Sequence, residues 1–274
     1  MKGKICIVTG ASSGIGKATA HELAKSGATV ILMCRDRIKG DAAVAEIKKA
    51  SEGATVELMI VDLSNQLSIR DAVKSYLRKY DRLHVLINNA GVFKSQRVVT
   101  SDGLETMFGT NYLGHFLLTN LLLDRLKSSA PSRIINVTAP STTKLNFDDL
   151  QGEKKFGGFT AFGASKMCNL LFSYDLARTM SGTGVTSNAI HPGLVRSNIM
   201  NEAPGILRWI LNLLSSPPHE AAKAIARLAL SPALETVSEK FFKGTKEIAA
   251  APYARDEKVQ ERLREVAKKL VQTK

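Results

Sequence analysis

The stretch ICIVTGASSGIG, residues 5–16, constrains the fold more than any other part of the chain. A short apolar run ends at Thr9 and Gly10, a glycine-rich turn follows, and an amphipathic pattern begins directly after it. This order predicts a strand, a tight turn and the start of a helix. The unpaired N–H groups and the dipole of a helix N-terminus favour a bound phosphate there. Gly10 would permit the turn, Gly14 the approach of a pyrophosphate, and Gly16 close packing of helix on strand.

Apolar runs and helical patterns then alternate to about residue 190. The apolar runs predict strands at residues 28–34, 55–61, 83–87, 133–137 and 185–190. The helical patterns predict helices at residues 35–50, 64–79, 102–127 and 163–180. Ser64 is the expected N-cap of the second of these helices. Near-continuous apolar strands separated by helices indicate a parallel sheet that is buried on both faces.

These elements predict an α/β fold in which residues 1–274 form a single Rossmann-type domain. Right-handed crossovers would give a doubly wound parallel sheet with helices on both faces. After Pro192 the pattern changes to helices at residues 207–214 and 220–230, a short strand at residues 240–242, and a C-terminal helix at about residues 253–272. With the glycine turn at the head of a βαβ unit, a dinucleotide site is expected.

Composition and charge exclude several classes of protein. The net charge is +13, but the basic residues are spread along helices and no nucleic-acid motif accompanies them, so a solvated cationic surface is expected. We find no signal peptide and no apolar run long enough to span a membrane. The three cysteines Cys6, Cys34 and Cys168 are scattered, which favours core residues in a reducing, cytoplasmic compartment. No His, Cys and Asp cluster has metal-ligand spacing, so no metal is expected.

Several short motifs occur in an order that, taken together, is highly specific. They are Thr9 to Gly16, Cys34-Arg35-Asp36, Asp62-Leu63, Asn88 to Gly91, Asn111 to Phe116, Ser165-Lys166 and His191 to Gly193. With these motifs the whole chain resembles the short-chain dehydrogenase/reductase family, and the C-terminal part is similar to its retinol-dehydrogenase-like branch. The membrane-anchoring N-terminal segment usual in the animal retinol enzymes is missing, which points to a soluble relative.

The resemblance implies a nicotinamide cofactor along the carboxyl edge of the sheet. In the family an acidic residue that ends the second strand selects NAD, and Cys34 stands there. Arg35 follows, where a guanidinium meets the 2′-phosphate of NADP, so NADP(H) is the expected cofactor. Asp62 should meet the adenine edge, and Asn88 should either lie along the cofactor or only support the strand ends. The resemblance implies these further contact residues: Gly10, Ser12, Ser13, Gly14, Ile15, Gly16, Leu63, Asn89, Ala90, Gly91, Lys166, Pro192, Gly193, Val195 and Ser197.

The catalytic pattern of the family is incomplete in this chain. The family uses a tyrosine as proton donor, a lysine four residues later that lowers the tyrosine pKa, a serine that holds the carbonyl oxygen, and an asparagine that anchors a water relay. Lys166 and Asn111 match the lysine and the asparagine. Phe162 stands at the tyrosine position and Ala139 at the serine position. The active site is therefore expected to be degenerate.

Three explanations of this pattern stay open. The chain could be a diverged or altered NADP(H)-dependent oxidoreductase with impaired turnover. Other hydroxyls could substitute, with Thr138, Ser141 and Thr142 as candidates and Tyr112 or His191 as more remote ones. The site could also have turned to a non-redox lyase or isomerase step, or to binding a cofactor without catalysis.

The segment APGILRWILNLL, residues 203–214, is apolar around most of its circumference. In the family this region forms a lid, here at about residues 193–216, so a small hydrophobic carbonyl or alcohol is the expected substrate. Core packing, an oligomer contact and a membrane-surface helix are the alternatives for this segment. By analogy with the family we expect a homo-oligomer, either a dimer or a tetramer.

Overall fold

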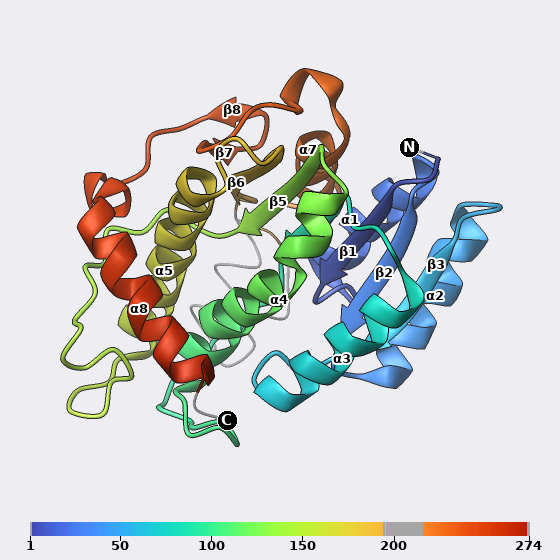
Figure 1. Cartoon of the computed structure of the whole chain (residues 1–274). Coiled ribbons are helices and arrows are strands. Elements are labelled where there is room, and N and C mark those ends of the chain that lie inside the picture. Colours follow the sequence, from blue (N-terminus) through green and yellow to red (C-terminus); the bar gives the residue numbers. More distant parts are fainter. Residues whose placement is uncertain (1, 194, 196–215, 273–274) are drawn as a thin grey trace.

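The fold is built around one sheet, and the computed structural model describes residues 2–193, 195 and 216–272 of the chain. In these residues the sheet has eight strands in the order β3-β2-β1-β4-β5-β6-β7-β8 (Figure 1). The strands are β1 (Ile5–Thr9), β2 (Thr29–Cys34), β3 (Val56–Ile60), β4 (Val85–Asn88), β5 (Ser132–Val137), β6 (Val185–His191), β7 (Phe241–Lys243) and β8 (Lys246–Glu247). All neighbours pair in parallel except β7 and β8, which are antiparallel.

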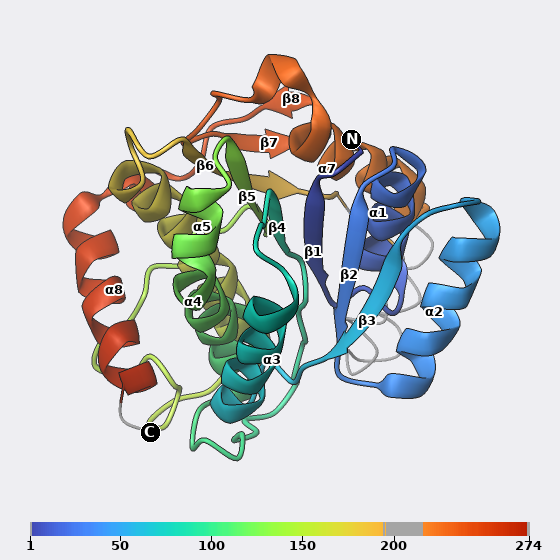
Figure 2. The same ribbon diagram turned by 45° about the vertical axis from the view of Figure 1, so that its right-hand side comes forward.

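Helices cover both faces of the sheet, as Figures 1 and 2 show. They are α1 (Gly14–Lys25), α2 (Arg37–Ala50), α3 (Gln66–Lys79), α4 (Gly114–Ser128), α5 (Gly158–Thr179), α7 (Pro218–Leu230) and α8 (Glu257–Gln272). Side chains of α1, α2 and α7 share one hydrophobic core cluster, and those of α3, α4, α5 and α8 share another. The predicted doubly wound α/β fold is therefore confirmed.

The residues of β1 show why its sequence is apolar throughout. Cys6 and Val8 face the core that contains α1, while Ile7 faces the opposite core, and all three side chains are fully buried. Successive side chains of a strand point to opposite faces, so a strand covered on both faces needs apolar residues at every position. Since β1 lies between β2 and β4, the crossover direction reverses here, and such a switch point opens a crevice at the carboxyl ends of the strands.

The helix predicted at residues 102–127 begins later than expected. Val99 and Glu105 form an isolated bridge, and a π-helical segment, η1 (Phe108–Leu113), precedes α4. The Glu105 carboxylate accepts hydrogen bonds from the backbone N–H groups of Met107 (2.8 Å) and Phe108 (2.7 Å). It thereby satisfies donors that have no partner inside a helix, which fixes the start of the helical segment after residue 105.

The predicted cap of α3 is also wrong by one residue. The Asn65 side chain, not that of Ser64, accepts from the backbone N–H of Ser68 at 2.8 Å. The Ser64 hydroxyl instead donates to the Asp62 carboxylate at 2.6 Å. An acceptor two residues upstream thus competes for the serine and leaves the cap to the asparagine.

Other boundaries differ in both directions. Helix α5 begins at Gly158 rather than at residue 163, so Phe162 lies inside its second turn. Helix α8 begins at Glu257, after the short 3₁₀ turn η4 (Pro252–Arg255). The strand β8 was not predicted, and the predicted helix at residues 207–214 lies outside the described part of the chain.

His115 of α4 connects β1 to the π-helical segment η1. Its Nδ1 lies 3.0 Å from the backbone oxygen of Asn111, which only accepts, so Nδ1 carries the hydrogen. Its Nε2 therefore accepts from the Thr9 hydroxyl at 2.9 Å, and the oxygen of that hydroxyl accepts from the backbone N–H groups of Asn89 and Ala90. Burial lowers the pKa of His115 to about 4, and this neutral tautomer fits both partners.

Because the pKa of His115 is lower in the folded state than in the unfolded chain, the unfolded chain binds more protons between about pH 6.5 and pH 4. We expect His115 to contribute stability that is fully present above pH 6.5 and lost as the pH falls to 4, by about 3 kcal/mol. Urea unfolding from pH 4 to 8 should show a shallower pH dependence in His115→Gln. The same change at exposed His219 should leave the dependence unaltered, and a variant at His115 that keeps the full slope would contradict this assignment.

Gly114 lets α4 approach the turn that follows β3. A Cβ on Gly114 would overlap the backbone oxygen of Leu63 and lie 3.0 Å from its Cβ. Although alanine is the better helix former, we expect Gly114→Ala to lower the free energy of unfolding by about 1–3 kcal/mol because of this overlap. At Gly157 an added Cβ meets nothing closer than 3.5 Å, so Gly157→Ala is the control in denaturant titrations. Equal stability of the two variants would refute the close contact.

Candidate functional site

The glycine turn after β1 leaves no room for a Cβ at Gly10 or Gly16. Gly10 has φ +64° and Gly14 has φ +53°, values that favour glycine. A Cβ on Gly10 would lie 2.9 Å from the Cα of Ala90, and a Cβ on Gly16 would lie 2.6 Å from the Asn89 amide nitrogen and overlap the Gly10 oxygen. The turn is therefore pressed between β1, α1 and the end of β4.

The N-terminus of α1 opens onto this turn. Ser13 occupies the N-cap position, and its side chain makes no capping hydrogen bond to the helix. The first N–H groups of the helix are thus left for another acceptor, and the helix dipole favours an anion there. A tight turn with glycines at positions 10, 14 and 16, next to helix N–H groups that no side chain of the N-cap residue satisfies, fits the pyrophosphate of a dinucleotide.

The end of β4 is fastened to β1 by side-chain hydrogen bonds. The Asn89 amide donates to the backbone oxygen of Thr9 at 2.8 Å. Asn88 instead points into the sheet, where its amide donates to Thr119 (3.0 Å) and Asn136 (2.9 Å). Of its two expected roles, the geometry favours support of the strand ends. Ala90 and Gly91 follow at the same edge and are half-buried.

The end of β2 carries the residues expected to distinguish the cofactors. Cys34 is buried, and burial raises the pKa of its thiol to about 11, partly opposed by a hydrogen bond with Ser12. Arg35 is exposed, and no acidic side chain in the described ranges pairs with it. The neighbouring Asp36 caps α2 through the backbone N–H of Lys39. A neutral thiol and an unpaired guanidinium therefore stand where the ribose end of a dinucleotide is expected.

The residues after β3 form a tight turn. One carboxylate oxygen of Asp62 accepts from the backbone N–H of Ser64 at 2.9 Å, and Leu63 is packed against α4. Asp62 is half-buried at the carboxyl edge of the sheet. The turn thus holds the Asp62 side chain in place at that edge.

Lys166 and Phe162 lie on one face of α5. The Lys166 Nζ is 5.2 Å from the centroid of the Phe162 ring, a cation–π distance. The Lys166 residue is 6% exposed, and burial lowers its pKa to about 8. The two residues, four apart in the sequence, are therefore in contact, and an aromatic ring without a hydroxyl faces the ammonium group.

Asn111 is fully used in holding the loop after β4. Its side-chain oxygen accepts from the Val92 N–H at 2.8 Å, and its amide donates to the Val92 oxygen and the Ser165 hydroxyl, both at 3.0 Å. The Ser165 hydroxyl donates in turn to the Phe162 oxygen at 2.8 Å. Ser165 was missed as a positioning residue, although its place next to Lys166 was the available signal.

The hydroxyls proposed as substitutes near Ala139 already have partners. Thr138 donates to the Lys166 backbone oxygen at 2.9 Å, and Ser141 donates to the Gly163 oxygen at 2.8 Å. Both bonds fasten the loop after β5 to α5, so a move toward substrate would break them. Thr142 is exposed and remains open to this role.

The two more remote candidates lie in packed surroundings. Tyr112 is buried among Phe108, Phe116 and Phe172, with ring centroids 5.6–6.0 Å away. Burial lowers the pKa of His191, partly opposed by a hydrogen bond with the backbone of Thr138. Tyr112 therefore serves the core, while His191 ends β6 at the carboxyl edge.

The chain after β6 turns sharply at Pro192 and Gly193, where Gly193 has φ +86°. Val195 pairs in a bridge with Ser216. Ser197 and nearly all of the predicted lid at residues 193–216 lie outside the described residues.

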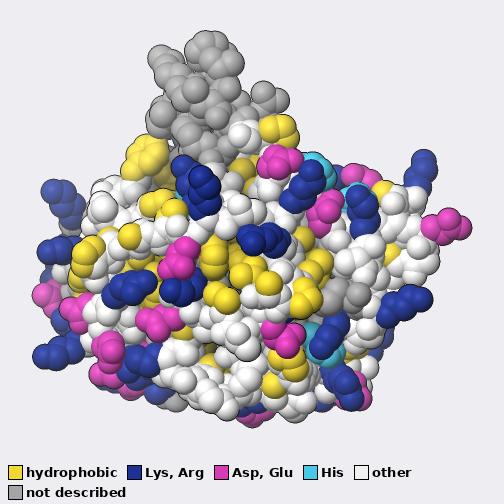
Figure 3. Space-filling view, turned by 90° about the horizontal axis from the view of Figure 1, so that it is seen from above, with side chains coloured by type: hydrophobic (Ala, Val, Ile, Leu, Met, Phe, Trp, Pro, Cys, Tyr) yellow, Lys and Arg dark blue, Asp and Glu magenta, His cyan; other side chains and the backbone are white. Residues whose placement is uncertain are grey.

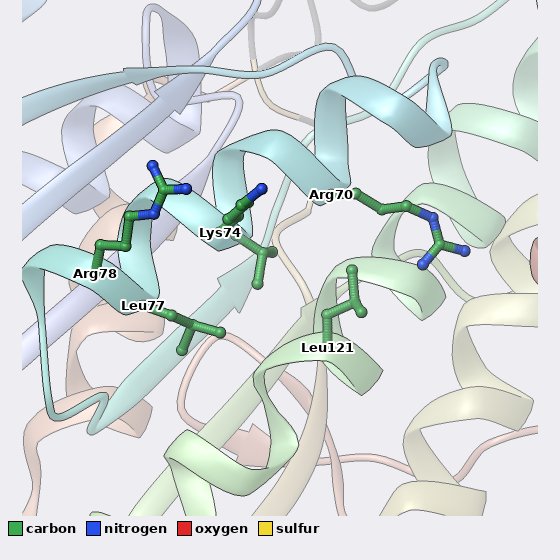
Figure 4. Close-up of a pocket in the computed structure, with 6 residues that line it drawn as sticks. Arg70, Lys74, Leu77, Arg78 and Leu121 are labelled. Carbon is green, nitrogen blue, oxygen red and sulfur yellow. The ribbon is translucent and has the colours of Figure 1, made fainter.

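Two surfaces lie away from this edge. A groove of about 430 Å³ between α3 and α4 is lined by Arg70, Lys74, Leu77, Arg78 and Leu121 (Figure 4), together with Val73. It contains none of the predicted site residues.

On the face seen in Figure 3, Lys and Arg side chains stand apart with Asp and Glu among them, which is typical of a solvated surface.

Two features are absent from the described ranges. No helix there is long and apolar enough to cross a membrane. No group of three or more His, Cys, Asp or Glu side chains in the same ranges could hold a metal ion.

Known proteins resemble this chain in sequence and in fold. The family model for short chain dehydrogenases matches residues 4–205. Retinol dehydrogenase 12 of Mus musculus is 44% identical over 275 residues, which cover 98% of this chain and 86% of that protein. Retinol dehydrogenase 14 of Homo sapiens is 41% identical over 292 residues, which cover 99% and 87%.

Solved structures agree with these relatives. An uncharacterised protein from Mycobacterium paratuberculosis has a TM-score of 0.75 and 30% identity, over 100% of this chain and 95% of that one. A metagenomic short-chain oxidoreductase in complex with NADP has a TM-score of 0.69 and 25% identity, over 90% and 99%. The chain therefore belongs to the short-chain dehydrogenase/reductase family, oxidoreductases that act on CH–OH groups, in its retinol-dehydrogenase-like branch.

Proposed function

We propose that the protein is an NADP(H)-dependent dehydrogenase/reductase of a hydrophobic carbonyl or alcohol, with turnover weakened by Phe162 and Ala139. The observation that carries this proposal is the Lys166 ammonium 5.2 Å from a phenylalanine ring, where the family places a hydroxyl. The relatives named retinol dehydrogenases support an apolar alcohol or aldehyde as substrate.

The residues at the start of α1 and after β2, which we call the nucleotide edge, fit such a cofactor. The free N–H groups at the start of α1 would hold the pyrophosphate, and the exposed Arg35 would bind a 2′-phosphate through charge-assisted hydrogen bonds. The NADP complex of a 25% identical family member supports the phosphate assignment. When bound, the nicotinamide supplies or accepts the hydride.

The remaining chemistry falls to the side chains of this chain. A carbonyl that accepts a hydride needs a proton at its oxygen, and Phe162 has none to give. A positioned acid is worth roughly 10²–10⁴ in rate. A hydrogen-bond donor to the carbonyl oxygen is worth roughly 10²–10³. Lys166 and Asn111 are both present and packed against α5 residues, so the site retains these two residues but lacks a proton donor.

The three cysteines are free and buried, which suits a reducing compartment such as the cytoplasm. We therefore place the reaction there.

Restoring the hydroxyls should restore the reaction. We expect Phe162→Tyr with Ala139→Ser to raise the rate of NADPH oxidation with apolar aldehydes by about 10²–10⁴, because a proton donor returns next to Lys166. Phe162→Leu with Ala139→Ser is the control without the phenol. If the tyrosine variant binds NADPH but gains no activity over a broad panel of carbonyl compounds, a lyase, isomerase or binding role replaces the reductase.

Charge reversal at Arg35 tests the cofactor. We expect Arg35→Glu to weaken NADPH binding by about 10- to 100-fold and NADH binding far less, because the carboxylate repels only the 2′-phosphate. Fluorescence titration of both nucleotides measures this ratio. Arg82→Glu is the control, since exposed Arg82 precedes β4 at the opposite edge of the sheet. Equal losses for the two nucleotides would contradict the phosphate assignment.

A further inference from the structure

Lys166 is unusual because it is a buried lysine whose amine has no polar partner among the described residues. No hydrogen bond or ion pair to Nζ occurs in the described part of the chain, and its neighbour is the Phe162 ring. Burial alone lowers its pKa, from the ordinary value of 10.5 to about 8. At pH 7 roughly one-tenth of the amine is then neutral, on the order of 300-fold more than at the ordinary value. Neutral lysine amines in apolar surroundings are nucleophiles toward carbonyl carbons.

Aromatic rings continue from this amine along the same face of α5. Phe159, Phe162 and Lys166 follow at helical spacings of three and four residues, so they line one face. Phe93 packs on both rings, with centroids 5.0 Å from Phe159 and 5.8 Å from Phe162. Phe159 is 51% exposed, although it is a large apolar side chain. The Cα atoms of Phe159 and Lys166 thus lie about 10 Å apart along the helix axis, and the Phe159 ring is open to solvent.

We propose that this row, Phe159, Phe162 and Lys166 with Phe93 behind it, captures apolar aromatic aldehydes as an imine on Lys166. The rings of Phe159 and Phe162 bind the aromatic part of the ligand. The Nζ lone pair forms a bond to the aldehyde carbon, and the C=O π electrons move to the oxygen, which takes up a proton while the nitrogen releases one. The resulting carbinolamine loses its oxygen as water and forms C=N. Amine and aldehyde thus give imine and water, with no oxidation or reduction.

Phe162 is what makes this chemistry available. A tyrosine there would offer its hydroxyl to the ammonium, whereas the phenyl ring only contacts the charge through its π face. The capture requires no nucleotide, so it stands independently of the proposed reduction. The family resemblance implies that Lys166 forms a hydrogen bond to the nicotinamide ribose. An Nζ that is part of an imine cannot form that bond, so nucleotide binding and imine formation should exclude each other.

Reductive trapping tests the capture. The full chain is incubated with 2-naphthaldehyde and cyanoborohydride, and the labelled lysines are located by peptide mass spectrometry. At pH 7 we expect Lys166 to be labelled at least about tenfold faster than exposed Lys144 and Lys155. Labelling of Lys166 at or below the rate of these surface lysines would overturn the proposal.

The pH profile separates this amine from surface amines. Labelling of Lys166 should rise with pH and reach half its maximum near pH 8, since only the neutral amine reacts. The charge of Lys166 also acts on His115 of α4, which stays neutral at these pH values because burial lowers its pKa to about 4. A profile that rises only above pH 10 would contradict the capture.

Two variants keep the test independent of folding. Lys166→Arg should lose the label while it retains the positive charge. Phe159→Leu alters an exposed ring, so the fold should persist, and the aldehyde concentration for half-maximal labelling should rise several-fold for 2-naphthaldehyde but not for butanal. Equal changes for both aldehydes would contradict a ring-binding site.

Added NADP⁺ distinguishes the two proposals. Protection of Lys166 from labelling supports both the capture and the nucleotide site. Rapid labelling without protection supports the capture and contradicts the nucleotide placement. Protection of a Lys166 that reacts no faster than Lys144 supports the nucleotide site and overturns the capture.

Discussion

The contact between the glycine turn and the end of β4 is the constraint on which the site depends. Gly10 and Gly16 let the turn, α1 and Asn89 approach until no Cβ would fit. The Thr9 hydroxyl joins the same junction to the backbone of Asn89 and Ala90 and to His115. Since β1 and β4 are neighbours at the switch point of the sheet, this junction fixes where the N-terminus of α1 points. His115 links this junction to Asn111 in the π-helical segment. Asn111 in turn bonds to Ser165 of the helix that carries Lys166, so the junction also positions that helix.

The second feature of the site is a charge held in apolar surroundings. In most proteins a buried lysine is paired, because an isolated ammonium is costly to desolvate. Here Lys166 meets an aromatic ring instead, and burial lowers its pKa toward neutrality. The hydroxyls close to it, Thr138, Ser141 and Ser165, are directed to backbone oxygens of α5. They stabilise the helix and its loop, so these hydroxyls are structural, and none of the described residues forms a hydrogen bond or ion pair with the Lys166 amine.

Much of the fold could be read from the sequence because the signals are local or periodic. Near-continuous apolar runs identified the parallel strands, and the glycine spacing identified the turn. Boundaries differed from the prediction where neighbouring side chains compete for the cap, as with Ser64 and Asn65, or where the bridge between Val99 and Glu105 delays a helix. The role of Asn88 also needed the structure, since its partners Thr119 and Asn136 lie on other elements.

The sequence by itself determined the fold class, the family and the absence of hydroxyls at residues 139 and 162, because motif order and residue identity are properties of the chain alone. Only the tertiary structure decided what surrounds Lys166. Its contact with Phe162 is local to α5, but the Phe93 ring that packs on Phe162 and the Asn111 amide that holds Ser165 come from segments more than fifty residues away. Desolvation is a sum over all neighbours in space, so the reactivity of this amine cannot be read from its place in the chain.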